Sequence, residues 1–178
     1  MAKFLVIAEK PSVAQCLAKN LSAYQREDGY LEGNSCIVSW CLGHLAEYAP
    51  PEIYDEKYEK WQFDDLPILP EAWKLKVSKD KKKQFEVIKT LMNRSDVEYL
   101  VNGCDAGREG ELIFKRVYDL AGCQKPVKRL WISSMEDEAI QKGFQTLKDG
   151  KEYAGLCNAA VCRAQAYIRG DIGDCYVA

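Results

Sequence analysis

The strongest constraint on the fold of this chain is the alternation of short apolar runs with stretches of helical periodicity. The first run, at residues 4–8, is apolar throughout, as expected for a strand that is covered on both faces. Pro11 then suits the first position of a helix, whose buried stripe recurs at helical spacing between residues 13 and 21. Strands predicted at 97–101 and 128–132 are likewise followed by helices. This repeated order predicts parallel strands joined by right-handed crossovers.

The remaining segments predict additions to this parallel core. A hairpin is expected over residues 30–40, with its turn at Gly33-Asn34, and a further short strand over 73–77. Prolines interrupt regular structure from 49 to 70, where aromatic side chains would fix a long loop to the body of the protein. Helices are predicted over 80–92, 109–121 and 152–169, and another from a Ser133–Glu136 capping box to about Gly150. We therefore expect an α/β fold, with a mostly parallel central sheet of about four strands flanked by helices.

Composition narrows the class of protein. The 178 residues suit one domain, and 47% hydrophobic with 29% charged residues is ordinary for a globular chain. No apolar run approaches a membrane span or a signal peptide, so we expect an intracellular protein without a membrane partner. The eight cysteines form no Cys-x-x-Cys pair and there is one histidine, which disfavours zinc and favours reduced, mostly buried thiols. With a net charge of −2, contact with nucleic acid would depend on local cations.

Acidic residues follow two of the predicted strands. Glu9 and Lys10 come directly after the first strand, and residues 105–111 (DAGREGE) follow the strand at 97–101. In open α/β sheets, reactive groups collect beyond the carboxyl ends of the strands. Hard oxygen ligands without nearby Cys or His select Mg²⁺, which can neutralise charge on nucleic-acid phosphates. We therefore expect four carboxylates to meet at one sheet edge and hold Mg²⁺, namely Glu9, Asp105, Glu109 and Glu111.

An alternative interpretation of the second segment needs no metal. Glu109 and Glu111 lie at the start of a predicted helix, where the positive end of the helix dipole favours acids. Two acidic strand ends beside one crevice nevertheless favour a site.

Several stretches resemble the Toprim domain of type IA DNA topoisomerases, and they are most similar to the bacterial topoisomerase III group. The two signature stretches are 7–12 (IAEKPS) and 105–111 (DAGREGE). Supporting stretches keep their order within residues 2–166: 43–47 (GHLAE), 60–61 (KW), 65–67 (DLP), 129–134 (RLWISS) and 160–164 (AVCRA). The resemblance implies a Toprim, Rossmann-like fold. It also implies a family that cuts one DNA strand with a tyrosine, passes another strand through and rejoins the cut.

The resemblance also implies roles for the acidic segments. Glu9 would serve in acid–base chemistry at the scissile phosphate, and Lys10 would steady the negative charge of that phosphate. Asp105 and Glu109 would bind Mg²⁺ together with Glu9, with Glu111 close behind. Arg108 would balance the acids or touch the DNA backbone.

Two residues in the supporting stretches are candidate DNA contacts. His44 lies in 43–47, where a packed or capping role is the alternative, and Arg163 lies in 160–164, where the alternative is a salt bridge.

Two features depart from the family pattern. Gly107 takes the place of the middle acid in Asp-x-Asp-x-Glu, so metal affinity is expected to be weaker. Residues 167–178 do not match the family's continuation.

We expect a Toprim domain at 1–150. We expect residues 151–178 to form a helix leading toward the next topoisomerase domain, with a non-matching tail.

The family's nucleophilic tyrosine lies on another domain, and none of the ten tyrosines here sits in a similar stretch. The chain alone is therefore expected not to cleave DNA. Its expected partners are the remaining topoisomerase domains and single-stranded or negatively supercoiled DNA, in the bacterial cytoplasm at the nucleoid. The alternative is a stand-alone DNA-binding or regulatory module that keeps the fold without turnover. A Toprim primase or nuclease is disfavoured because the stretches beyond the acids match topoisomerase III.

Overall fold

The computed structural model describes residues 2–60 and 62–169, centred on a seven-stranded sheet in the order β2-β3-β4-β1-β7-β8-β9. Its middle strands run parallel to one another: β4 (Cys36–Trp40), β1 (Lys3–Ala8), β7 (Val97–Gly103) and β8 (Val127–Arg129). The outer strands are antiparallel: β2 (Gln25–Glu27), β3 (Tyr30–Glu32) and β9 (Lys148–Asp149). The expected α/β fold, its parallel core and the β3–β4 hairpin are confirmed. The strands β2 and β9 are too short for a sequence pattern to predict.

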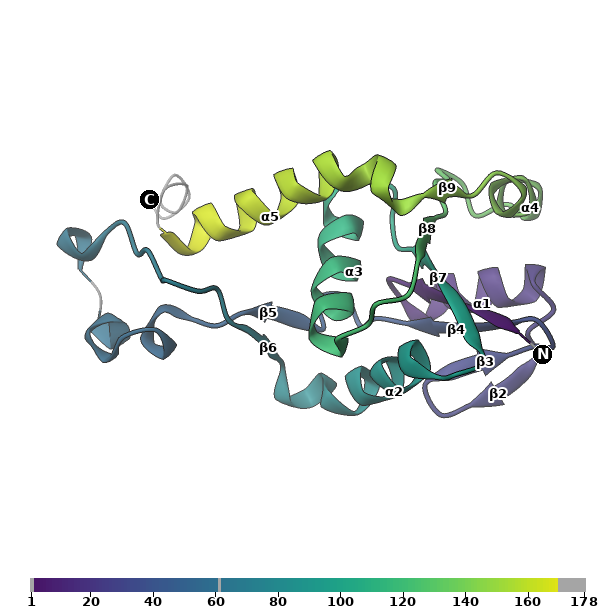
Figure 1. Cartoon of the computed structure of the whole chain (residues 1–178), viewed down its shortest axis with the longest axis horizontal. Helices are drawn as coiled ribbons and strands as arrows, with labels where there is room; N and C mark the ends of the chain where they lie inside the picture. The colour runs from purple at the N-terminus through teal and green to yellow at the C-terminus, as the bar shows by residue number, and fades with distance from the viewer. Residues whose placement is uncertain (1, 61, 170–178) are drawn as a thin grey trace.

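Helices cover both faces of this sheet, and one more lies outside them (Figure 1). One face carries α1 and α4, which bury Leu17 and Ile140, and the other carries α2 and α3, which bury Ile88 and Val117. The last helix, α5, packs on α3 and extends past the sheet. Their bounds are α1 (Pro11–Asn20), α2 (Lys82–Asn93), α3 (Arg108–Ala121), α4 (Asp137–Gln145) and α5 (Ala154–Arg169). In the described residues, no helix is both long and apolar enough to cross a membrane.

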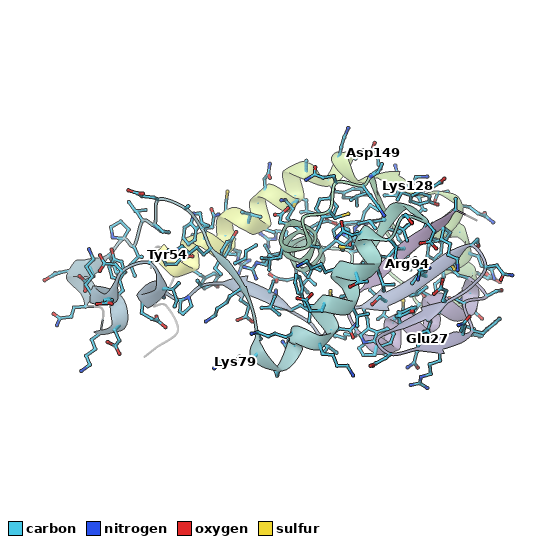
Figure 2. All side chains as sticks on the ribbon, turned by 60° about the horizontal axis from the view of Figure 1, so that its bottom comes forward. Glu27, Tyr54, Lys79, Arg94, Lys128 and Asp149 are labelled. Carbon is cyan, nitrogen blue, oxygen red and sulfur yellow. The ribbon has the colours of Figure 1, made fainter. Side chains whose placement is uncertain are left out.

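A second, two-stranded sheet pairs β5 (Ala46–Tyr48) with β6 (Leu75–Val77). The segment between them contains the 3-10 turns η1 (Pro51–Ile53), η2 (Glu56–Lys60) and η3 (Phe63–Asp65) and projects from the central sheet (Figures 1 and 2). Of the aromatic residues expected to fix this segment, Tyr54 packs on Trp73, with ring centroids 6.1 Å apart. Trp61 lies outside the described residues, so the anchoring of the whole segment stays a prediction.

The start and the end of α4 differ from the prediction. The expected capping box at residues 133–136 is wrong, because Glu136 is the N-cap of α4 and no side chain caps it. Instead, Asp149 and Glu152 form a reciprocal capping box at η5 (Gly150–Tyr153), a 3-10 turn that leads into α5. The helix α4 also ends at Gln145 rather than near Gly150, since β9 takes up the following residues.

The described cysteines are free thiols, four of them buried.

Candidate functional site

The carboxyl ends of four parallel strands form one edge of the sheet, and the predicted acidic segments lie there. Ala8, the last residue of β1, is opposite Gly103, the last residue of β7. Glu9 therefore leaves the sheet beside the turn that leads from β7 to Asp105. This placement agrees with the rule that ligands of open α/β sheets bind beyond the carboxyl ends of the strands.

Glu9 is mostly withdrawn from solvent at this edge. Its side chain is 13% exposed, and its Oε2 is buried without a hydrogen-bond partner in the described part of the chain. Lys10 Nζ lies 4.0 Å from the other oxygen, Oε1. A hydrogen bond with Cys41, together with burial, raises the pKa of the nearby Cys104 thiol, so Cys104 is a neutral packing group. An unpartnered buried carboxylate oxygen is costly, and a proton or a cation would relieve that cost.

The turn that carries Asp105 is shaped by a close approach of α3. A Cβ atom on Gly110 would lie 2.1 Å from the carbonyl oxygen of Asp105, so only glycine fits there. Gly107 caps the helix with extended backbone, φ 169°, and a Cβ atom there would meet nothing within 4 Å. Asp105, Arg108 and Glu109 are exposed around this turn. The acidic segment therefore presents its charged groups to solvent on a tightly fixed backbone.

Glu111 points away from the other acids and into the protein. It is 7% exposed, and its Oε1 accepts a 2.6 Å hydrogen bond from Nε of Arg129, which is itself buried. Burial raises the pKa of the Glu111 carboxyl, and the attraction of Arg129 opposes that rise. Residues two positions apart on a helix point in different directions, about 200° around the axis. Glu109 and Glu111 therefore do not face one ion.

Arg129 joins the buried pair to the backbone of the acidic turn. Its Nη1 donates to the carbonyl oxygens of Asn102, Cys104 and Leu130 at 3.0, 2.6 and 2.9 Å. Its Nη2 donates to the carbonyl oxygen of Asp105 at 2.6 Å. The pair therefore fixes the backbone that positions Asp105.

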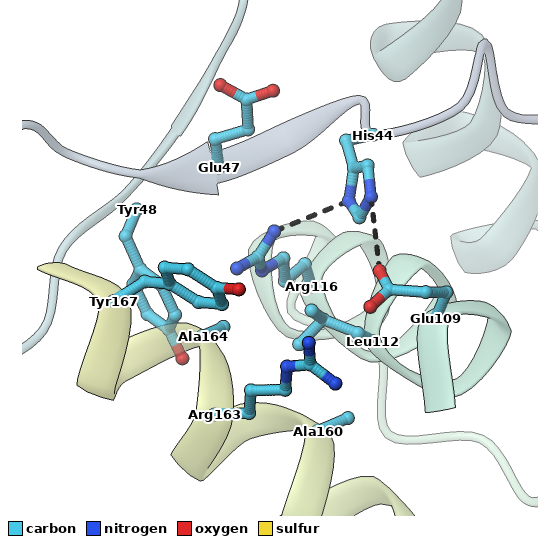
Figure 3. Close-up of a pocket in the computed structure, with 10 residues that line it drawn as sticks. All are labelled: His44, Glu47, Tyr48, Glu109, Leu112, Arg116, Ala160, Arg163, Ala164 and Tyr167. Atoms are coloured by element: carbon cyan, nitrogen blue, oxygen red, sulfur yellow. Dashed lines mark hydrogen bonds and ion pairs between the residues drawn. The ribbon is translucent and has the colours of Figure 1, made fainter. Parts of the chain in front are cut away.

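Glu109 lies on the rim of a pocket between α3, α5 and β5 (Figure 3). Its Oε2 is 3.4 Å from His44 Nε2, and His44 Nδ1 is 3.4 Å from Arg116 Nη1. Arg163 of α5 lines the same pocket, whose volume is about 390 Å³. The structure thus brings together three of the predicted site residues, Glu109, His44 and Arg163. Sequence reasoning missed Arg116, although it lies two helical turns after Glu109, on the same face of α3.

The expected cluster of four carboxylates is not assembled as predicted. Within residues 2–60 and 62–169, no group of three or more His, Cys, Asp or Glu side chains is placed to hold a metal ion. Glu9 and Asp105 follow neighbouring strands, whereas Glu109 turns to His44 and Glu111 turns to Arg129. Glu9 and Asp105 therefore lie at the edge of the sheet itself, and Glu109 lies on the rim of the neighbouring pocket.

Comparison with known proteins agrees with this architecture. A family model described as the Toprim domain matches residues 4–135. DNA topoisomerase 3 of Bacillus subtilis is 49% identical over 166 residues, and that of Shouchella clausii is 50% identical over the same length. These alignments cover 93% of this chain and 23% of each relative, so the chain spans about a quarter of their length.

A solved structure shares the fold. The full-length topoisomerase I of Thermotoga maritima superposes with a TM-score of 0.62 at 19% identity, covering 92% of this chain and 24% of that protein. The chain belongs to the Toprim domain family and is similar in sequence to part of bacterial DNA topoisomerase 3.

Proposed function

We propose that this chain is the metal-binding Toprim portion of a type IA DNA topoisomerase, an isomerase that cuts, passes and rejoins single DNA strands. The observation that carries the proposal is the unpartnered Oε2 of Glu9, at a strand end beside the Asp105 turn. Exposed cations flank these acids, Lys10 after β1 and Arg108 at the start of α3. The acids could bind a metal ion, and the cations could bind phosphate. Together they support chemistry at a DNA phosphodiester.

The residues of the edge take different proposed roles. Glu9 would hold or release a proton at Oε2 while bonds change at the scissile phosphate, since this oxygen is shielded yet unpartnered. Lys10 would offset the negative charge of that phosphate. Arg108 would balance the acids or contact the DNA backbone. Glu111 would act as a positioning residue, through Arg129 and the carbonyl groups of the acidic turn.

The donor set fits Mg²⁺. Carboxylate oxygens are its preferred protein ligands, and one or two carboxylates often suffice because water and substrate phosphate complete its coordination. Glu9 and Asp105 would hold the ion, and Glu109 would join them on leaving His44. When bound, the ion would neutralise negative charge on the phosphate.

The other partners follow from the same proposal. The nucleophilic tyrosine would come from topoisomerase domains outside this chain. The chain matches only 23% of the length of its relatives. Residues 1–150 would form the Toprim domain, and 151–178 would lead toward those domains, although 170–178 lie outside the described residues. The proposed substrate is single-stranded or negatively supercoiled DNA, acted on in the cytoplasm at the nucleoid.

Thermal unfolding with and without Mg²⁺ tests the metal site. Millimolar Mg²⁺ should raise the Tm of this chain by about 2–4 °C per kcal/mol of binding free energy. Asp105→Asn should abolish the rise, because the amide cannot replace the carboxylate charge. Asp119→Asn, the same change at an exposed acid near the far end of α3, should retain it. An unchanged Tm in the parent chain, or an equal rise in Asp105→Asn, would count against the site.

Relaxation of negatively supercoiled DNA separates turnover from binding alone. This chain, mixed with the remaining domains of a topoisomerase 3 relative, should restore relaxation. The same mixture with Glu9→Gln should not. If folded pieces associate and bind DNA without relaxing it, a binding or regulatory module becomes the better description.

A further inference from the structure

Trp131 lies on the guanidinium group that holds the acidic turn. Cζ of Arg129 is 5.0 Å from the centre of the Trp131 ring, within reach of a cation–π contact. The same guanidinium donates to the carbonyl oxygens of Cys104 and Asp105, both at 2.6 Å. Arg129 is 1% exposed, whereas Trp131 is 42% exposed. The indole therefore lies between this buried cation and the solvent.

Tyr153, the last residue of η5, packs on the same indole. The two rings are stacked, with centroids 4.8 Å apart and planes inclined by 22°. Such aromatic pairs stabilise beyond the area that they bury. Tyr153 immediately precedes Ala154, the first residue of α5. A continuous series of contacts therefore runs from the start of α5 through Trp131 and Arg129 to the acidic turn.

Local contacts hold the turn that carries Tyr153 against the sheet. The preceding strand β9 pairs with β8, and the start of α5 follows beside them (Figure 1). A Cβ atom on Gly150 would lie 2.9 Å from the carbonyl oxygen of Val127, so η5 approaches β8 as closely as a glycine permits. Asp149 accepts a 2.9 Å hydrogen bond from the backbone of η5, and Glu152 accepts one in return. The tyrosine ring is therefore presented to Trp131 from a fixed backbone.

We propose that Trp131 and Tyr153 are positioning residues, through which the start of α5 controls how firmly the Asp105 turn is held. The inference rests on the proposed function, since its consequence is metal affinity at the acidic edge. All three nitrogen atoms of Arg129 donate, to Glu111 and to four carbonyl oxygens. These bonds lie near the plane of the guanidinium, and its faces remain available for stacking. The indole therefore restrains the one direction that the hydrogen bonds leave soft.

The role of Trp131 is local to this contact rather than part of the general core. Neither of the two hydrophobic clusters formed by the described residues includes Trp131. Its replacement should therefore leave the sheet and its covering helices intact. Since α5 begins directly after Tyr153, a displacement of that helix would reach the acidic turn through the two stacked rings.

The first test is a Mg²⁺ titration of the full chain, followed by the rise in Tm. Trp131→Leu keeps apolar bulk but removes the aromatic face, and it should raise the Mg²⁺ concentration for half-maximal effect by about threefold or more. Trp131→Phe restores a ring and should recover most of the affinity. Tyr153→Ala should act in the same direction, whereas Tyr153→Phe should match the parent. A purely structural role would lower the Tm without moving the half-maximal concentration.

Hydrogen exchange without metal is the second readout. The backbone amides of residues 104–107 should exchange about threefold faster or more in Trp131→Leu and Tyr153→Ala than in the parent, because the turn opens more often. Trp73→Leu makes the same change in an aromatic pair beside β6, and it should alter neither exchange at this turn nor the Mg²⁺ response.

The outcomes separate the inference from the proposed function. Parent-like exchange and Mg²⁺ response in Trp131→Leu would overturn the inference while the metal site stands. Effects of Trp131→Leu without any effect of Tyr153→Ala would overturn control by α5. A parent chain that does not respond to Mg²⁺ would instead defeat the proposed function, and faster exchange in both variants would still support the positioning of the turn.

Discussion

Arg129 donates a 2.6 Å hydrogen bond from Nε to Glu111 Oε1 inside the protein, and the same guanidinium holds the carbonyl oxygen of Asp105 at 2.6 Å. A buried ion pair therefore links the first turn of α3 to the turn that carries a proposed metal ligand. Since Arg129 is 1% exposed, water cannot replace its partners.

Removing one member of this ion pair should lower the unfolding free energy far more than removing both members. Arg129→Met leaves Glu111 buried and unpaired, together with several backbone carbonyl groups, and should cost about 3–5 kcal/mol of unfolding free energy. The double variant Arg129→Met/Glu111→Leu should be less destabilised than the sum of its single variants. Urea unfolding of all four proteins gives the coupling energy. Additive losses would contradict the close coupling of these two side chains.

Substitution by alanine should destabilise the protein at one glycine of the acidic turn and have little effect at the other. Gly110→Ala would place a Cβ atom 2.1 Å from the Asp105 carbonyl oxygen, so α3 or the turn must move, at about 1–3 kcal/mol or more. Gly107→Ala, three residues earlier, meets nothing within 4 Å and has an extended backbone, and should be nearly neutral. Thermal unfolding compares the two variants directly. Equal losses would mean that the close approach of α3 is not what selects glycine.

The acidic edge could be predicted because it depends on local signals. Glu9 and Asp105 directly follow apolar strands, and parallel strands bring their carboxyl ends to one edge whatever the details of packing. The direction of Glu111 follows from the helical period, since residues two positions apart on a helix cannot face one ion. The same periodicity places Arg116 on the face of Glu109.

Other features depend on tertiary packing and left no local signal. The buried position of Arg129 contradicts the usual exposure of arginine, and its partners lie 18 to 27 residues away in sequence, apart from Leu130. The pocket joins β5, α3 and α5, which are separated along the chain and meet only after folding. The two shortest outer strands likewise follow from pairing with their neighbours.

An ion-pair network at the opposite end of the sheet should govern acid stability. Two hydrogen bonds from Arg94, at 2.9 and 3.1 Å, lower the pKa of Glu32, and Lys3 reinforces the effect. A lowered pKa means that the stabilisation is complete above the ordinary value of 4.5 and is lost as pH falls through the folded-state value.

Glu32→Gln should therefore lower unfolding free energy by about 1–3 kcal/mol at pH 7, and the difference should shrink progressively below about pH 4.5. Urea unfolding of the parent and the variant from pH 3 to 7 measures this difference in unfolding free energy. Glu98→Gln, at an exposed acid of β7, supplies the control. A difference that does not change with pH would show that the charge of Glu32 is not responsible.

Restoring the missing acid should strengthen Mg²⁺ binding at the proposed site. Position 107 lies between Asp105 and Glu109 in the acidic turn, and its open surroundings and extended φ of 169° accept a side chain without strain. One more negative charge near a divalent ion is worth about 1 kcal/mol or more even at the dielectric of water, or about fivefold in affinity. Gly107→Asp should lower the Mg²⁺ concentration for half-maximal Tm increase by at least that factor. Gly107→Asn, of equal size but uncharged, should leave it nearly unchanged, and equal responses from both variants would argue against a metal ion at this edge.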